Sequence, residues 1–139
     1  MQGRKFLDVA TELAANTTEA HWRSAVGRAY YALFLEGREA LRRWGFSIPS
    51  RNQVHAFVRL RFSYATLVDL KRIGDILDRL VQYRNLADYD LASSPHFVTN
   101  VKAKRAVADA TNALGLLDPI DADPARQAAA IAEIRAAWP

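Results

Sequence analysis

The sequence predicts an all-α protein, an up-and-down bundle of five to six helices. Glycine is scarce throughout, proline is scarce until the C-terminal third, and the alternating pattern that is typical of β-strands is absent. Apolar residues instead recur every three or four positions, as they do on the buried face of an amphipathic helix. Of the 139 residues, 50% are hydrophobic and 24% are charged, as in a soluble globular protein. We expect a single domain over residues 1–139 that buries a core without disulfides or metal ions.

The composition excludes several classes of protein. The chain has no cysteine, which excludes disulfides, thiolate zinc sites and cysteine nucleophiles, and which is typical of the cytoplasm. The sequence contains no run of about 18 apolar residues, so no transmembrane helix is expected. Residues 1–8 lack the apolar segment of a signal peptide. The net charge is +4 and the pI is about 9.7, with arginine greatly outnumbering lysine. We therefore expect a cytoplasmic protein without a membrane partner, and its charge suits a partner that carries phosphate.

The first two helices are predicted from apolar spacing and from the residues at their ends. The first helix runs roughly over residues 4–15. The second begins at Thr17 or Thr18, because either hydroxyl can cap a helix N-terminus, and it runs to about Trp44. Gly45 follows as the C-terminal cap residue, since glycine adopts a left-handed conformation there at little cost. A helix of this length is usually the centre of a bundle.

The third and fourth helices carry the most basic segment and the most unusual motif. Ser50 is the predicted N-cap of a third helix over residues 51–62, which is rich in arginine. Thr66 is the predicted N-cap of the fourth helix, and Asp69 stands where a capping-box carboxylate would lie. The apolar spacing of the fourth helix continues into residues 83–90, where this helix is predicted to end.

The fifth helix is predicted to follow a loop at residues 91–94. Ser94 and Pro95 form a typical pair of N-cap and first helical residue, so this helix begins at Pro95 and runs to about Leu116. Its apolar positions are spaced more loosely than those of the second helix.

A last helix is predicted after a break at residues 118–122. Asp123 and Pro124 are suited to start it, and it runs to about Ala137. Because alanine makes up about half of this helix, little apolar area holds it to the bundle. We expect residues 118–139 to be loosely attached, either docked on a partner or frayed.

The motif at residues 83–90, Tyr-Arg-Asn-Leu-Ala-Asp-Tyr-Asp, collects polar groups at the end of the fourth helix. The apolar stripe of this helix, continued in register from Leu77 and Leu80, reaches Arg84. A guanidinium on such a stripe needs a partner or must open onto a cleft, and a conflict of this kind is typical of functional sites. Asp88 is the nearest partner, one turn further along the helix. The alternative is a plain helix end whose polar groups face water.

Two adjacent tyrosines, Tyr30 and Tyr31, form the second unusual feature. Neighbouring positions on a helix point about 100° apart, so we expect the two phenols to enter different surroundings. In one interpretation one ring belongs to the core and the other lines a helix interface. In the other, one hydroxyl reaches the polar cluster at the end of the fourth helix.

Metal and cofactor chemistry finds little support. The three histidines, His21, His55 and His96, are far apart in sequence and show no metal-ligand spacing. Asp88 and Asp90 offer oxygen ligands for magnesium, but two carboxylates near a helix end are far more often solvated. The chain also lacks a phosphate-binding glycine loop and a Gly-x-Ser-x-Gly nucleophile motif. We expect no metal and no cofactor.

Taken together, three segments resemble the HEPN superfamily. They are residues 28–34 on the long second helix, His55 at the start of the third helix, and residues 84–90 with the pattern Arg-x-x-Ala-Asp-Tyr-Asp. The pattern is most similar to that of the small stand-alone HEPN proteins, and the resemblance covers roughly residues 4–117. It implies an up-and-down helical bundle that dimerises.

The resemblance implies one of two kinds of function. Many HEPN proteins are metal-independent ribonucleases of toxin–antitoxin, CRISPR and other defence systems, whereas others bind RNA or nucleotides or pair with small nucleotidyltransferases. The motif of the active members is an arginine followed by a polar residue and, a few residues later, by a histidine. Arg84 and Asn85 match its start, but Tyr89 and Asp90 stand where the histidine would fall. Because histidine titrates near neutral pH and tyrosine does not, this chain looks better equipped to hold a phosphodiester than to cleave one.

We therefore expect a homodimer with a basic cleft around two copies of Arg84, which binds RNA or a nucleotide in a toxin–antitoxin or defence-type module. Residual ribonuclease activity would use Tyr89, Asp88 or His55 in place of the motif histidine. The alternative is a non-catalytic interaction module that pairs with a nucleotidyltransferase-like partner. The candidate catalytic residues are Arg84, Asn85, Asp88 and Tyr89, and the candidate substrate-binding residues are Arg28, Tyr31, His55 and Arg59.

Overall fold

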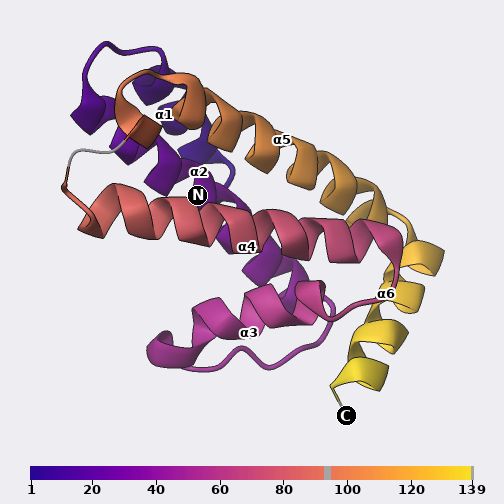
Figure 1. Cartoon of the computed structure of the whole chain (residues 1–139). Helices are drawn as coiled ribbons and strands as arrows, with labels where there is room; N and C mark the ends of the chain where they lie inside the picture. Colours follow the sequence, from indigo (N-terminus) through magenta and orange to yellow (C-terminus); the bar gives the residue numbers. More distant parts are fainter. Residues whose placement is uncertain (93–94, 139) are drawn as a thin grey trace.

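The computed structural model describes residues 1–92 and 95–138. Within them the chain forms six α-helices, one short 3-10 helix and no strand (Figure 1), which confirms the predicted all-α bundle. In chain order these are α1 (Lys5–Ala14), α2 (Glu19–Arg43), α3 (Arg51–Ser63), α4 (Val68–Tyr89), the 3-10 helix η1 (Pro95–Phe97), α5 (Val101–Ala122) and α6 (Pro124–Ala137).

The long helix α2 is the centre of the bundle, as predicted. It packs against α1, α4 and α5, and its second half also meets α3 (Figure 1). Its core face is fully buried at Val26, Leu33 and Leu41. Thr18 caps its N-terminus through a hydrogen bond from the His21 amide. Gly45 follows its C-terminus with φ of 92°, a conformation that glycine adopts without strain.

The start of α4 differs from the prediction. Helix α4 begins at Val68 and has no side-chain cap, because the Thr66 side chain hydrogen-bonds to α6 instead. The Thr66 amide and hydroxyl both donate to the Glu133 carboxylate of α6, the hydroxyl at 2.8 Å. Asp69 likewise forms an ion pair with Arg126 of α6 at 3.1 Å instead of completing a capping box. Ser50 does occupy the N-cap position of α3, but its side chain makes no capping hydrogen bond.

Helix α5 also differs from the prediction at both ends. Pro95 belongs to the separate helix η1, and the predicted cap Ser94 lies outside the described residues. The predicted break at residues 118–122 is wrong, because α5 continues through Pro119 to Ala122. Tertiary contacts hold this last turn in place, since Ile120 is buried and Asp121 accepts hydrogen bonds from Arg43 and Trp44 at 2.7 and 2.9 Å.

Helix α6 begins where the sequence predicts. The Asp123 carboxylate accepts hydrogen bonds from the amides of Ala125 and Arg126 and so caps the helix. The helix packs against α5 and buries Ile134 completely. Loose attachment of residues 118–139 stays a prediction. Within the described residues, no helix combines the length and the apolar character that crossing a membrane requires.

Candidate functional site

Arg84 lies where α2, α3 and α4 meet. Its side chain is 20% exposed, and its Nε donates a hydrogen bond to Asp88 Oδ2 at 3.1 Å. The pair expected from the spacing of one helical turn is therefore present. The Asp88 carboxylate in turn lies over Gly27 of α2, where a Cβ atom would come within 3.7 Å of Oδ1. A small residue on α2 thus leaves room for the carboxylate that holds Arg84.

Three phenol rings surround the Arg84 guanidinium. Its central carbon lies 5.8 Å from the Tyr30 ring centre, 5.7 Å from that of Tyr31 and 5.7 Å from that of Tyr89, distances that favour cation–π attraction. Tyr30 and Tyr31 differ in burial, as expected, because Tyr30 is a core residue and Tyr31 is half-buried, but the expectation that they enter separate surroundings is wrong at Arg84. Their backbone positions diverge on α2, but the rings converge edge to face, 5.8 Å apart, and both border the same arginine.

His55 of α3 joins the same aromatic group. Its ring stacks on Phe34 with centres 4.1 Å apart, and its Nδ1 lies 2.7 Å from the Tyr30 hydroxyl. Burial lowers the His55 pKa below its ordinary value, and the nearby positive charges of Arg84 and Arg38 lower it further. The imidazole is therefore neutral at physiological pH, the state in which histidine can accept a proton.

Tyr30 holds His55 in place. The residue is only 2% exposed, and burial raises its pKa to about 12, although the charge of Arg84 opposes that rise. The hydroxyl therefore stays protonated and serves as a hydrogen-bond partner of the imidazole. It reaches His55 and not the polar groups at the end of α4, so the core interpretation holds for Tyr30. We call Arg84, Asp88, Tyr30, Tyr31 and His55 the Arg84 cluster.

Arg28 and Arg59 lie beside the cluster. Arg28 is exposed, and its guanidinium carbon lies 5.9 Å from the Tyr31 ring centre and 5.5 Å from that of Phe6. Arg59 instead forms an ion pair with Asp78 of α4 at 2.9 Å. Its charge is thus shared with a carboxylate, whereas Arg28 faces water at the edge of the cluster.

Asn85 and Tyr89 belong to an exposed surface next to the cluster. They line a shallow groove at the end of α4 together with Gln82, Leu86 and Asp90. Tyr89 is 72% exposed, so its ring both borders Arg84 and offers a face to solvent. The structure therefore places Asp88, Tyr31 and His55 around Arg84, and Asn85 on the neighbouring surface.

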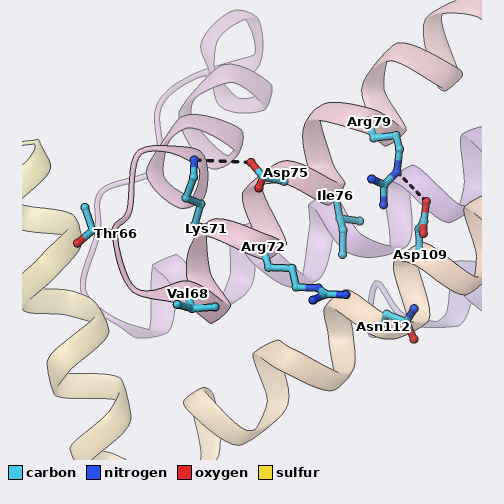
Figure 2. A pocket seen from close by; sticks show the side chains of 9 residues that line it. All are labelled: Thr66, Val68, Lys71, Arg72, Asp75, Ile76, Arg79, Asp109 and Asn112. Carbon is cyan, nitrogen blue, oxygen red and sulfur yellow. Dashed lines mark hydrogen bonds and ion pairs between the residues drawn. The ribbon is translucent and has the colours of Figure 1, made fainter.

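A different groove lies between α4 and α5, about 460 Å³ in volume (Figure 2). Arg79 pairs there with Asp109 at 3.0 Å and Lys71 with Asp75 at 3.8 Å. Arg72 extends toward α5 without an ion pair to any described residue (Figure 2). No histidine or tyrosine lines this groove, and its carboxylates Asp75 and Asp109 are held in ion pairs. Its charges mostly neutralise each other, and the Arg84 cluster remains the better candidate site.

Arg23 is a second arginine on an apolar helix face, and the sequence pattern was not used to predict it. Arg23 is 8% exposed, and one of its terminal nitrogens donates to the carbonyl oxygens of Leu86, Ala87 and Asp90. Arg23 precedes the core residues of α2 in helical register, just as Arg84 follows those of α4. An arginine on an apolar stripe is the signal that identified Arg84, and the same signal identifies Arg23.

Among residues 1–92 and 95–138, no three histidine, aspartate or glutamate side chains gather in a way that could hold a metal ion. The model of one protein family, described as HEPN domain, matches residues 1–119. No curated protein and no solved structure matches the chain significantly.

Proposed function

The chain belongs to the HEPN domain family, and on that basis we propose that it binds RNA by its sugar–phosphate backbone at the Arg84 cluster. One observation carries this proposal. The Nε of Arg84 donates its hydrogen bond to Asp88, whereas neither terminal nitrogen of Arg84 donates a hydrogen bond to a described residue. A guanidinium with its forked edge free is suited to bidentate binding of a phosphate.

The surroundings of Arg84 support a nucleic acid over a small anion. Tyr89 is 72% exposed and Tyr31 is half-buried, so both offer faces on which unpaired bases can stack. Arg28 adds an exposed positive charge at the edge, and the whole chain carries a net charge of +4. Single-stranded RNA presents phosphates and unstacked bases together, which matches this mixture of cation and aromatic rings.

The proposal is tested by comparing Arg84→Ala with Arg126→Ala. Arg126 is a matched control, because it also forms one ion pair with a carboxylate but lies on α6. In fluorescence anisotropy with a single-stranded RNA, we expect Arg84→Ala to lose at least about tenfold in affinity, the effect of one good charged contact. Arg126→Ala should bind like the wild type. Equal losses in the two variants would mean that only diffuse charge attracts RNA. Competition by a mononucleotide at similar affinity would assign the site to nucleotides.

A second function is favoured by one further observation, the neutral His55 beside Arg84. It is cleavage of RNA without a metal ion. His55 would take the proton of a 2′-hydroxyl, whose oxygen attacks the adjacent phosphorus. The bond to the 5′ oxygen breaks, and that oxygen receives a proton from water or from Tyr89. Arg84 would stabilise the charge on the phosphoryl oxygens. The products are a 2′,3′-cyclic phosphate and a 5′-hydroxyl.

This cleavage should persist in EDTA and should depend on His55. We expect His55→Ala to lower the rate by about 10²- to 10⁴-fold, the usual contribution of a general base, while RNA binding is retained. Tyr89→Phe removes only a hydroxyl, so a large rate loss in a folded variant would assign Tyr89 the proton transfer to the leaving oxygen. If the wild type cuts no RNA while Arg84-dependent binding persists, the protein is a binding module.

Our proposal for the cellular setting rests on family membership alone. A toxin–antitoxin or defence-type module is our proposal for the setting, with a nucleotidyltransferase-like protein as the alternative partner. The neighbouring genes distinguish the two, because a small nucleotidyltransferase beside this gene would favour the pairing over the ribonuclease.

A further inference from the structure

The last turn of α4, which carries Asp88 and Tyr89, is held from outside by Arg23 of α2. One terminal nitrogen of Arg23 lies 3.1 Å from the Leu86 carbonyl oxygen, 3.0 Å from that of Ala87 and 2.7 Å from that of Asp90. The Leu86 carbonyl also accepts a hydrogen bond from the Asp90 amide of its own helix at 3.1 Å, whereas the last carbonyls of a helix lack partners within the helix. A cation there is also favoured by the partial negative charge of the helix end.

Arg23 is itself fixed in position from two sides. Its Nε donates to Glu19 Oε1 at 2.9 Å. The other terminal nitrogen lies 2.9 Å from the same oxygen, an ion-pair contact without hydrogen-bond alignment. The guanidinium also lies over the Phe97 ring, 4.5 Å from its centre. Arg23 therefore joins α2, η1 and the end of α4 in one buried contact.

We propose that Arg23 is a positioning residue, which fixes the last turn of α4 so that Asp88 holds Arg84 with its forked edge toward the RNA. Only the last step, in which Arg84 faces RNA, rests on the proposed function. The Asp88 backbone lies between the carbonyls that Arg23 binds, and its carboxylate lies over Gly27 and bonds the Arg84 Nε. Helix ends fray when their terminal groups lose their partners. Without Arg23 the Asp88 carboxylate would leave Gly27, and Arg84 would lose the contact that orients it.

The test uses Arg23→Met, which keeps a side chain against Phe97 but removes all three hydrogen bonds to α4. Glu19 is already half exposed, with 52% of its side chain in water, so the variant leaves no buried unpaired charge. Arg79→Met is the matched control, because it also removes a tertiary contact of α4, the ion pair with Asp109, but this contact faces α5 and precedes the motif by one turn. Arg23→Lys, which keeps a cation below the carbonyls, serves if Arg23→Met does not fold.

The first measurement follows the His55 imidazole by NMR as a function of pH. The charge of Arg84 helps to lower the His55 pKa, so displacement of Arg84 should raise that pKa toward its ordinary value. We expect such a rise in Arg23→Met, a smaller one in Arg23→Lys and none in Arg79→Met. A variant that is only less stable would leave the His55 pKa unchanged. An unchanged pKa in a folded Arg23→Met or Arg23→Lys variant would overturn the positioning role.

The second measurement is RNA affinity in a double-mutant cycle with Arg84→Ala. If Arg23 acts through Arg84, Arg23→Met should weaken binding at least about fivefold alone but less than about twofold in the Arg84→Ala background. Equal effects in both backgrounds would overturn the proposal. If the wild type binds no RNA, the proposed function fails, and the His55 measurement still decides whether Arg23 positions Arg84.

Discussion

At the scale of single residues, each arginine on an apolar helix face has a partner, but of a different kind. Arg84 uses the carboxylate of Asp88 on its own helix and keeps its terminal nitrogens free. Arg23 uses backbone carbonyls of another helix and is buried more deeply. Arg23 thus forms contacts within the fold, whereas Arg84 is open to a ligand.

His55 makes the stability of the fold depend on pH. Its pKa is lower in the folded protein than the ordinary value of about 6.5, so the unfolded chain binds the proton more readily. The free energy of unfolding should therefore fall as the pH drops below about 6.5 through the folded-state pKa, and it should be insensitive to His55 above that range.

His55→Gln tests this prediction, because glutamine can still hydrogen-bond to the Tyr30 hydroxyl but does not titrate. Urea unfolding at several pH values should show that the fall of stability between about pH 6.5 and 5 is smaller in the variant than in the wild type. An identical slope in both proteins would contradict the assignment of a lowered pKa to His55.

Residue-level prediction succeeded where partners share a helix and failed where they do not. Spacing along one helix identifies Asp88 as the partner of Arg84. The contact between Tyr30 and His55 depends on how α3 packs on α2, and the contacts of Arg23 depend on where α4 ends. No periodicity within a single helix carries that information, so His55 was named as a candidate through the family resemblance and not through its contacts.

At the scale of the helices, α3 and α4 approach each other closely at Gly74. A Cβ atom at this position would lie 2.3 Å from the Ser63 amide nitrogen and 2.6 Å from the Phe62 carbonyl carbon. Both are backbone atoms, which cannot turn aside as a side chain can. Gly74 therefore sets the distance between the helix that carries His55 and the helix that carries Arg84.

Gly74→Ala should destabilise the protein by about 2 kcal/mol or more, because it forces two backbones apart. Gly115→Ala is the matched control, since it is also a helical glycine but has no atom within 4 Å of the added Cβ. That change should stabilise the protein by about 0.5–1 kcal/mol, the difference in helix propensity between the two residues. Thermal unfolding of the two variants should shift Tm in opposite directions, and a neutral Gly74→Ala would contradict the close approach.

The predicted helix ends were wrong where tertiary contacts outweigh local signals. Thr66 has the chemistry of an N-cap, but Glu133 of α6 takes its amide and hydroxyl. Proline normally interrupts a helix, but α5 continues through Pro119 because Asp121 accepts hydrogen bonds from Arg43 and Trp44 at the end of α2. Both partners come from distant parts of the sequence, whereas Thr18, Gly45 and Asp123 act through neighbouring residues and were predicted correctly.

At the scale of the whole molecule, the Arg84 cluster lies close to a group of exposed apolar residues. Leu91, Val98 and Val101 are each at least 67% exposed and lie between the end of α4 and the start of α5. Exposed apolar side chains are stabilised when they are covered by another protein surface. We propose that a second copy covers them, which would bring two copies of Arg84 to one basic cleft.

Light scattering at micromolar concentration tests this proposal, with an expected mass of twice the 15.6 kDa chain. Val101→Asp should shift the protein toward the monomer, because a carboxylate at a covered apolar position is left without water. Val68→Asp is the matched control, since Val68 is 77% exposed at the opposite end of α4, and it should remain a dimer. A wild-type monomer at this concentration would remove the shared cleft, and RNA would then be bound by single copies of Arg84. In that case, the affinity for RNA should not depend on protein association.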